Sequence, residues 1–246
     1  MNQQTLILDL DDTLIHCSKY FIKSKNQFAE QMQDWFDFLS KDEILQKQLE
    51  IDVKNVDKHG LHSSLYPESF VLTYKYFSVK YGRALKKSEI ELVRRMGQEV
   101  FELEVQPFPY VYDVLDSLLE DGHRLYLFTG GDKKNQRRKI NQLGLDCYFE
   151  DRVFIHEHKN STTLKKVLNR IECEKKSTWM VGNSLKTDVK PAIELGINAI
   201  HIPSDFEWSY NIIDLEIEPN GTFAELESLL QLPVYLRDYA FIHEAI

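Results

Sequence analysis

The sequence has few cysteines, no long apolar run and no excess of positive charge. Its cysteines, Cys17, Cys147 and Cys173, are odd in number and lack C-x-x-C spacing, which argues against a disulfide framework and a zinc ribbon. We therefore expect a reducing, cytoplasmic location. Nowhere do 18 uncharged apolar residues follow one another, and the first residues lack a basic segment, so neither a membrane span nor a signal peptide is expected.

The overall charge is negative. The 246 residues carry a formal net charge of −9 at pH 7. Such a charge repels polyphosphate backbones and anionic membrane surfaces, so we expect neither a nucleic-acid polymer nor a membrane as a partner. With 43% apolar residues the chain is expected to form one large domain, or a core with an insertion. No repeat is visible, and no pattern predicts an oligomeric state.

Short apolar segments alternate with helix-like segments over most of the chain. The first segment, Thr5 to Leu10, is continuously apolar, which is typical of a parallel strand buried on both faces. Further strands are predicted at residues 124–128, 152–155, 178–181 and 198–202. Strands that alternate with helices indicate an α/β fold with a mostly parallel sheet flanked by helices.

Residues 18–106 interrupt this alternation and are predicted to form a helical insertion after the first strand. One helix is indicated by Phe28, Met32 and Phe36, a second begins near Pro67, and a third begins at Ser88 with capping-box spacing to Glu91. The expected division is a core of residues 1–17 and 107–246 and an insertion of residues 18–106. Residues 233–246 show no interpretable pattern.

Polar side chains follow several of the predicted strands. Asp9, Asp11 and Asp12 come after the first strand, and Thr129 follows the second. The fourth is followed by a segment that contains Asn183 and Asp188. In open parallel sheets, ligands bind at the carboxyl ends of the strands, so these groups are expected to meet. Crowded carboxylates need a cation, and oxygen ligands suit Mg²⁺.

These residues stand in the order of four motifs, and the sequence resembles the haloacid dehalogenase-like hydrolase superfamily. Its D-x-D-x-T motif is matched by Asp9, Asp11 and Thr13, and its strand-end hydroxyl by Thr129. The remaining matches are Lys159, with Lys165 as an alternative for the basic residue, and Gly182, Asn183 and Asp188 for the G-D-x-x-x-x-D pattern. The resemblance implies a Rossmann-like core and places a C1 cap where the helical insertion stands.

The resemblance also implies roles for single residues. Asp9 would be the nucleophile that forms an aspartyl-phosphate, and Asp11 the general acid and base, with Thr13 in support. The phosphate would be bound by Thr129, the Gly130 amide and Lys159. Mg²⁺ would be bound by Asp9, the Asp11 carbonyl, Asn183 and Asp188. Many relatives have Asp where this chain has Asn183, so weaker metal binding is expected.

The predicted function is therefore a Mg²⁺-dependent phosphatase that acts on a small phosphorylated metabolite. Dehalogenases of the superfamily lack the second aspartate, so Asp11 favours phosphoryl transfer over dehalogenation. Two alternatives stay open: a phosphomutase of the same superfamily, and a silent binding protein with a degraded metal site. The histidines His59, His62, His156 and His158 are interpreted as loop residues, and Asp12 is expected to point away from the phosphate.

Overall fold

A single parallel sheet forms the centre of the computed structural model, which describes residues 3–215 and 220–244. The strand order is β3-β2-β1-β4-β5-β6, and every neighbouring pair is parallel. The strands are β1 (Thr5–Leu8), β2 (Arg124–Gly130), β3 (Val153–His156), β4 (Thr178–Gly182), β5 (Asn198–His201) and β6 (Phe223–Glu225). The predicted α/β class is confirmed, and β6 is a strand that the sequence did not indicate.

The register of the central strands determines which side chains meet at their carboxyl ends. Leu8 of β1 lies opposite Leu127 of β2 and Val181 of β4. Asp9, Thr129 and Asn183 follow these residues by one or two positions, so all three reach the same edge of the sheet. The strand β1 lies between β2 and β4, and its side chains Leu6, Ile7 and Leu8 are fully buried on both faces of the sheet.

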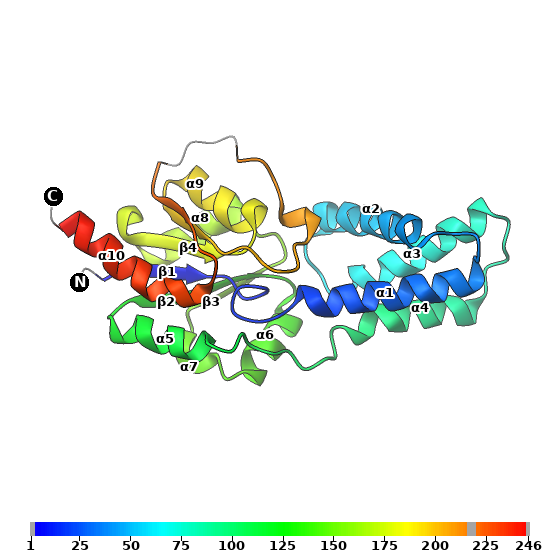
Figure 1. The fold of residues 1–246 in the computed structure, drawn as a ribbon, viewed down its shortest axis with the longest axis horizontal. Helices are drawn as coiled ribbons and strands as arrows, with labels where there is room; N and C mark the ends of the chain where they lie inside the picture. Colours follow the sequence, from blue (N-terminus) through cyan, green and yellow to red (C-terminus); the bar gives the residue numbers. More distant parts are fainter. Residues whose placement is uncertain (1–2, 216–219, 245–246) are drawn as a thin grey trace.

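Helices cover both faces of the sheet (Figure 1). One face packs against α5 (Val111–Glu120), α6 (Lys133–Gln142), α7 (Asp146–Phe149) and α10 (Leu232–Glu244). The other packs against α8 (Ser161–Ile171) and α9 (Lys190–Leu195). Short helical turns are η1 (Lys175–Ser177), η2 (Leu185–Val189), η3 (Ser209–Asn211) and η4 (Leu229–Gln231). None of the helices in the described part of the chain is long and apolar enough to cross a membrane.

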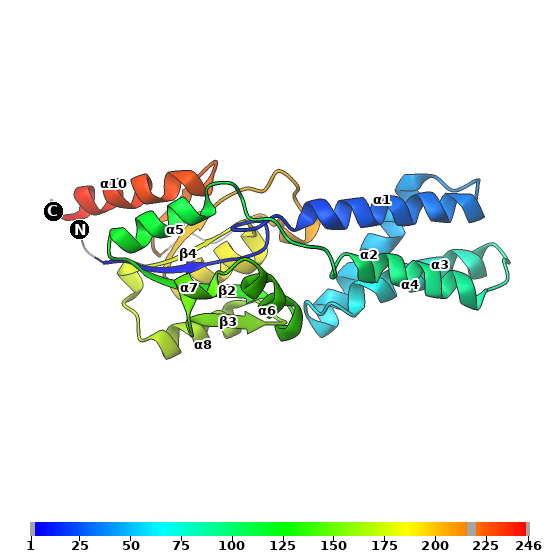
Figure 2. The ribbon, with the colours of Figure 1, turned by 90° about the horizontal axis from the view of Figure 1, so that it is seen from below.

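Four helices between β1 and β2 form a separate bundle, which we call the helical insertion (Figures 1 and 2). They are α1 (Ser18–Trp35), α2 (Lys41–His59), α3 (Leu65–Lys80) and α4 (Lys87–Glu99). The bundle has its own aromatic core, in which Phe28 stacks on Phe70 at 4.1 Å between ring centroids. Figure 2 shows that the bundle extends the molecule beyond the carboxyl edge of the sheet.

The insertion differs from the prediction in two respects. Helix α2 was not predicted, because two of its four buried positions are polar: Gln48 and Asp52. Helix α4 begins at Lys87, one residue before the predicted start, and the capping box between Ser88 and Glu91 does not form. Likewise, α3 begins at Leu65, two residues before Pro67.

The C-terminal segment is helical and packs on the core, although its sequence showed no interpretable pattern. Within α10, Tyr235 and Tyr239 make edge contacts with Trp179, at 5.9 Å and 4.8 Å between ring centroids. Trp179 itself is fully buried on β4. These contacts anchor the helix by aromatic packing that no spacing in the sequence indicates.

Candidate active site at the carboxyl edge of the sheet

Three charged side chains form a buried group at the carboxyl edge, which we call the strand-edge cluster: Asp9, Lys159 and Asp188. The Lys159 ammonium forms ion pairs with both carboxylates, and all three side chains are less than 10% exposed. Burial raises the pKa of Asp9, Lys159 lowers it and the nearby Asp188 raises it, with a net pKa of about 7. A single ammonium therefore holds two buried carboxylates together.

Thr13 connects Asp9 to the loop after β4. Its hydroxyl donates to Asp9 Oδ2 at 3.2 Å and accepts from the backbone N–H of Asn183 at 3.1 Å. The Asn183 side chain is buried and lines the same cavity as Asp9. Thr13 therefore fixes the orientation of the Asp9 carboxylate relative to Asn183.

Asp188 is positioned by a tight turn after β4. The π-helical turn η2 follows Ser184, whose side chain accepts from the Thr187 N–H at 3.0 Å. The backbone N–H of Ser184 donates to Asp188 Oδ2, also at 3.0 Å. Gly182 leaves the space for this carboxylate, since a Cβ atom there would lie 2.2 Å from Asp188 Oδ2. Single π-helical turns are frequent at functional sites.

Asp11 lies beside the strand-edge cluster but has different partners. Its carboxylate accepts from Lys139 Nζ at 2.7 Å and from Gln136 Nε2 at 2.9 Å. Gln136 also donates to Thr129 Oγ1 at 2.6 Å. Burial opposes ionisation of Asp11, but the Lys139 ammonium and these hydrogen bonds outweigh it and lower the pKa of the carboxyl. The sequence did not identify Gln136 and Lys139, because Ile140 is the only apolar residue of α6 and no apolar pattern shows which of its polar residues face the core.

Asp12 begins the helical insertion instead of facing Asp9. Its carboxylate accepts from the backbone N–H groups of Cys17 at 2.8 Å and Ser18 at 3.0 Å, at the start of α1. The residue itself has a φ of 60°, so the chain turns sharply between the strand and the helix. The negative charge stabilises the amino end of α1.

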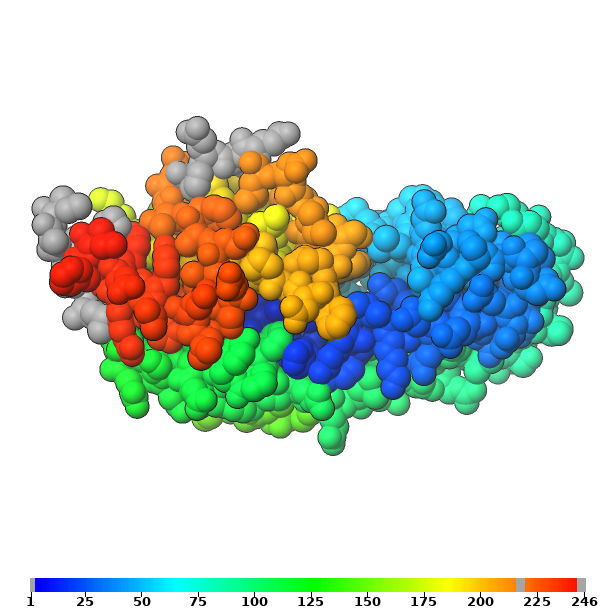
Figure 3. Space-filling view, in the orientation of Figure 1, coloured from blue at the N-terminus to red at the C-terminus, as the bar shows by residue number. Residues whose placement is uncertain are grey.

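The segment between α2 and α3 contacts the core directly. The Leu61 N–H donates to the carbonyl of Glu157 at 2.7 Å, and the Ser63 N–H donates to Asp132 at 3.1 Å. Leu61 lies so close to Gly130 that a Cβ atom on this glycine would be 2.6 Å from Leu61 Cδ1. Figure 3 shows the junction of the two parts, where the segment before η3 (amber) meets α1 (blue). The insertion therefore covers the carboxyl edge of the sheet.

A cavity of about 210 Å³ lies between the insertion and the core. Its core side includes Asp9, Asp11, Thr129, Gly130, Lys159 and Asn183. Its insertion side includes Phe21, Lys25, Asp52, Tyr66 and Phe101. The volume is below the roughly 300–1,000 Å³ of sites for drug-sized ligands, so it suits a molecule of metabolite size.

The other candidate residues lie outside the cluster. Lys165 is exposed on α8 and does not line the cavity. His59 is the last residue of α2 and His156 the last of β3, so neither is a loop residue. His62 lines the cavity, and its ring Nε2 lies 3.9 Å from Glu157. In the described part of the chain, no three His, Cys, Asp or Glu side chains gather as a metal site.

We expect Asp52→Asn to stabilise the protein more at pH 8 than at pH 5. Burial raises the pKa of Asp52 to about 7 despite the nearby Lys25, so ionising this carboxyl costs stability. The cost appears above the ordinary value of 3.8, grows as the pH rises towards 7, and is at most about 4 kcal/mol for such a shift. Urea unfolding at both pH values measures it. Equal effects at pH 5 and pH 8 would contradict the assignment, and Asp34→Asn, at an exposed position of α1, is the control.

Comparison with known proteins agrees with this architecture. The chain is 25% identical to a glyceraldehyde 3-phosphate phosphatase of Methanocaldococcus jannaschii, over 80% of this chain and 83% of that protein. It is 34% identical to a pyrimidine 5′-nucleotidase of Streptococcus pneumoniae, but over only 36% of this chain and 40% of that protein. A further match, 29% identical, is to a glyceraldehyde 3-phosphate phosphatase of Methanothermobacter thermautotrophicus, over 41% of this chain and 46% of that protein.

Solved structures share the fold. A haloacid dehalogenase-like hydrolase from Xanthomonas campestris superposes with a TM-score of 0.78 at 22% identity, over 96% of this chain and 91% of that chain. The haloacid dehalogenase-like hydrolase family matches residues 6–202, which include every residue of the strand-edge cluster. The chain belongs to the haloacid dehalogenase-like hydrolase family.

Proposed function

We propose that the protein is a Mg²⁺-dependent phosphatase that hydrolyses a small phosphorylated metabolite through an aspartyl-phosphate on Asp9. The observation that carries this proposal is the strand-edge cluster, in which a buried lysine contacts two buried carboxylates beneath a covering insertion. The names of the curated relatives, a glyceraldehyde 3-phosphate phosphatase and a pyrimidine 5′-nucleotidase, support a phosphomonoester as substrate.

The oxygen atoms at the cluster fit a hard divalent cation. Asp9 and Asp188 are buried carboxylates, and burial, together with the nearby Asp188, raises the pKa of Asp9, so a cation is needed to keep both ionised. The side chain of Asn183 and the carbonyl of Asp11 would complete an oxygen donor set with them. When bound there, Mg²⁺ would neutralise charge on the carboxylates and on the phosphate. Asn183 contributes no charge, so we expect weaker metal binding than with an aspartate.

The protein residues then have separable roles. Asp9 attacks the phosphorus atom, and Thr13 keeps its carboxylate oriented. Lys159, the Thr129 hydroxyl and the Gly130 amide stabilise the negative charge on the phosphoryl oxygens. Asp11 protonates the leaving oxygen and then takes a proton from water, and its contacts with Lys139 and Gln136 fix the position of its carboxylate. Residues 18–106 act as a cap that excludes water.

We expect Gly182→Ala to reduce hydrolysis about 100-fold. The added Cβ needs the space of the Asp188 carboxylate, 2.2 Å away, so the carboxylate must move out of the cluster. Misplacing a group at a reaction centre by about 1 Å can cost about 10²-fold in rate. Steady-state kinetics with a melting curve measures the effect. Activity equal to that of the unsubstituted protein would show that the position of Asp188 does not matter.

The proposed function is tested with a generic aryl phosphate at neutral pH. Release of inorganic phosphate is measured with Mg²⁺ and with a chelator, for the unsubstituted protein and for Asp9→Asn. Hydrolysis that needs both the metal and Asp9 supports a phosphatase. Transfer of the phosphoryl group to a sugar without phosphate release would favour a phosphomutase, and inactivity under all conditions would favour a silent binding protein.

A further inference from the structure

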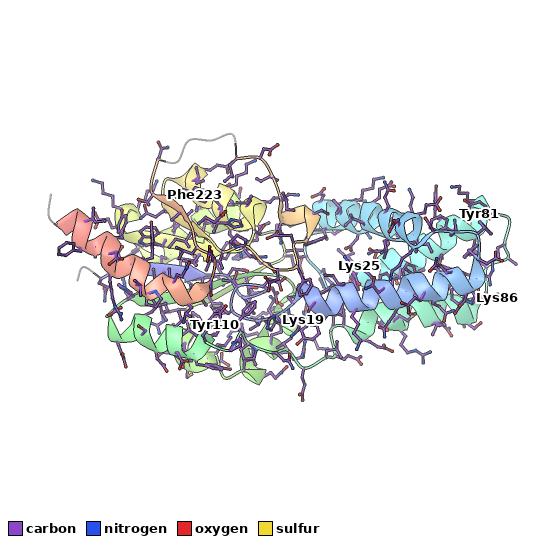
Figure 4. All side chains as sticks on the ribbon, in the orientation of Figure 1. Lys19, Lys25, Tyr81, Lys86, Tyr110 and Phe223 are labelled. Carbon is purple, nitrogen blue, oxygen red and sulfur yellow. The ribbon has the colours of Figure 1, made fainter. Side chains whose placement is uncertain are left out.

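Two charged side chains of the helical insertion face the cavity without contacting each other. Lys25 of α1 and Asp52 of α2 both line it, and Figure 4 shows Lys25 between these two helices. Asp52 is only 8% exposed. Among the described residues, neither side chain has an oppositely charged partner within 4.0 Å. The cavity therefore has a positive and a negative group on its insertion side, with space between them.

This pair is electrostatically separate from the strand-edge cluster. Burial is the main cause of both pKa shifts: it raises the pKa of Asp52 and lowers that of Lys25. Among the residues that the structure describes, the charge that counteracts each shift is the other member of the pair. No charge of the strand-edge cluster contributes to either shift. Lys25 and Asp52 line the cavity from the insertion, whereas Asp9 and Lys159 line it from the core, so a ligand that contacts both sets spans the cavity, with its phosphate at one end and a polar group at the other.

The walls near the pair are mainly aromatic and aliphatic. Phe21 makes edge contacts with Tyr66 at 4.8 Å and with Phe101 at 5.7 Å between ring centroids, and all three residues line the cavity. Val56 and Ile22 add aliphatic surface. Such walls suit a flat ring better than a polyol, since every hydroxyl of a polyol needs a hydrogen-bond partner when buried.

We propose that Lys25 and Asp52 form a subsite for the base of a nucleoside monophosphate. This proposal rests on the proposed function, because it places the phosphate of the ligand at Asp9. A nucleobase has a flat ring and, on one edge, a hydrogen-bond acceptor beside an N–H donor. Lys25 donates to the acceptor, and the Asp52 carboxylate accepts from the N–H. In a three-carbon phosphate the polar groups lie next to the phosphate, so such a substrate leaves the pair unused.

A purely structural role explains the pair less well. A buried carboxylate without an ion-pair partner costs stability, and an apolar residue at position 52 would avoid that cost. Asp52 also interrupts the apolar face of α2, whose other buried residues include Ile44 and Val56. Natural proteins depart from a regular apolar helix face mainly at functional sites.

The proposal is tested by comparing uridine 5′-monophosphate and adenosine 5′-monophosphate with ribose 5-phosphate, which carries a hydroxyl group in place of the base. We expect the unsubstituted protein to hydrolyse at least one nucleotide with a kcat/KM at least tenfold above that for ribose 5-phosphate. In Lys25→Met and in Asp52→Asn this ratio should fall about 10- to 100-fold, because a buried partner of the base is lost. Lys23→Met and Asp34→Asn, at exposed positions of α1, are the controls and should keep the ratio.

Three results would overturn the subsite: a nucleotide-to-ribose 5-phosphate ratio near one, a ratio unchanged in both variants, or an equal loss in the controls. Calorimetric binding of the same nucleotides to Asp9→Asn separates this proposal from the proposed function. If no ester is hydrolysed but nucleotide binding weakens at least tenfold on adding Lys25→Met or Asp52→Asn, the phosphatase proposal fails and the subsite stands. If nucleotides neither bind nor react while ribose 5-phosphate or an aryl phosphate is hydrolysed, the subsite fails and the phosphatase proposal stands.

Discussion

Replacing Asp9 by asparagine is expected to reduce phosphomonoester hydrolysis on the order of 10⁴-fold or more while the protein stays folded. An amide oxygen is a poor nucleophile, so no covalent intermediate forms. The shape of the side chain is kept, and its oxygen can still accept from Thr13, which lies 3.2 Å from the carboxylate. Lys159 keeps Asp188 as its partner. Steady-state kinetics, together with thermal unfolding at the same pH, measures both parts of this prediction.

The stability of this variant gives a second, independent result. Burial raises the pKa of Asp9 to about 7, so the ionised carboxylate is disfavoured in the folded protein. A neutral amide removes that cost, and we expect a melting temperature no lower than that of the unsubstituted protein above pH 7. Below pH 7 the difference should shrink as Asp9 takes up a proton. Hydrolysis that persists with an unchanged melting profile would rule out Asp9 as the nucleophile.

Lys159→Met is expected to lower both the stability and the activity of the protein. Only the loss of stability should be reduced by Mg²⁺. Without the ammonium, Asp9 and Asp188 are two buried carboxylates with no counter-charge, 5% and 1% exposed. Breaking a buried ion pair in this way costs about 3–5 kcal/mol, or roughly 6–20 °C in melting temperature for a chain of this size. Mg²⁺ should recover part of this loss of stability, whereas hydrolysis stays about 10²–10³-fold lower.

Lys165→Met is the matched control for this variant. Lys165 was the alternative basic residue in the sequence, and the structure places it exposed on α8. Its substitution should change the free energy of unfolding by less than about 0.5 kcal/mol. Melting curves of both variants in chelator and in Mg²⁺ make the comparison. A larger effect from Lys165 than from Lys159 would show that the wrong lysine was assigned.

The parts of the fold that the sequence predicts are those with clear apolar segments. Five strands appear within two residues of their expected ends. Helix α2 was missed because Gln48 and Asp52 occupy positions where an apolar residue would have marked its buried face. Helix α10 was missed because its tyrosines pack on Trp179, a contact across the molecule that no local pattern reveals.

In the candidate site, the sequence indicates the side chains that directly follow strands. It misses the side chains that reach the site from helices. Asp9, Thr129 and Asn183 were expected to meet because parallel strands end at one edge, and the register of β1 with β2 and β4 brings them there. Gln136 and Lys139 were missed, since their contacts with Asp11 join residues more than 120 positions apart. Which residues of the insertion face the cavity, such as Lys25, depends on how the helical insertion meets the core.

The most direct test of the mechanism is a search for the phosphoryl group on Asp9. In Asp11→Asn with an aryl phosphate and Mg²⁺, the good leaving group needs no acid, but release of the phosphoryl group to water needs the missing base. Rapid mixing followed by mass spectrometry should show a burst of about one aryl alcohol per protein and one phosphoryl group on the peptide that contains Asp9. Steady release of the alcohol without a burst, with Asp9 unmodified, would contradict the account.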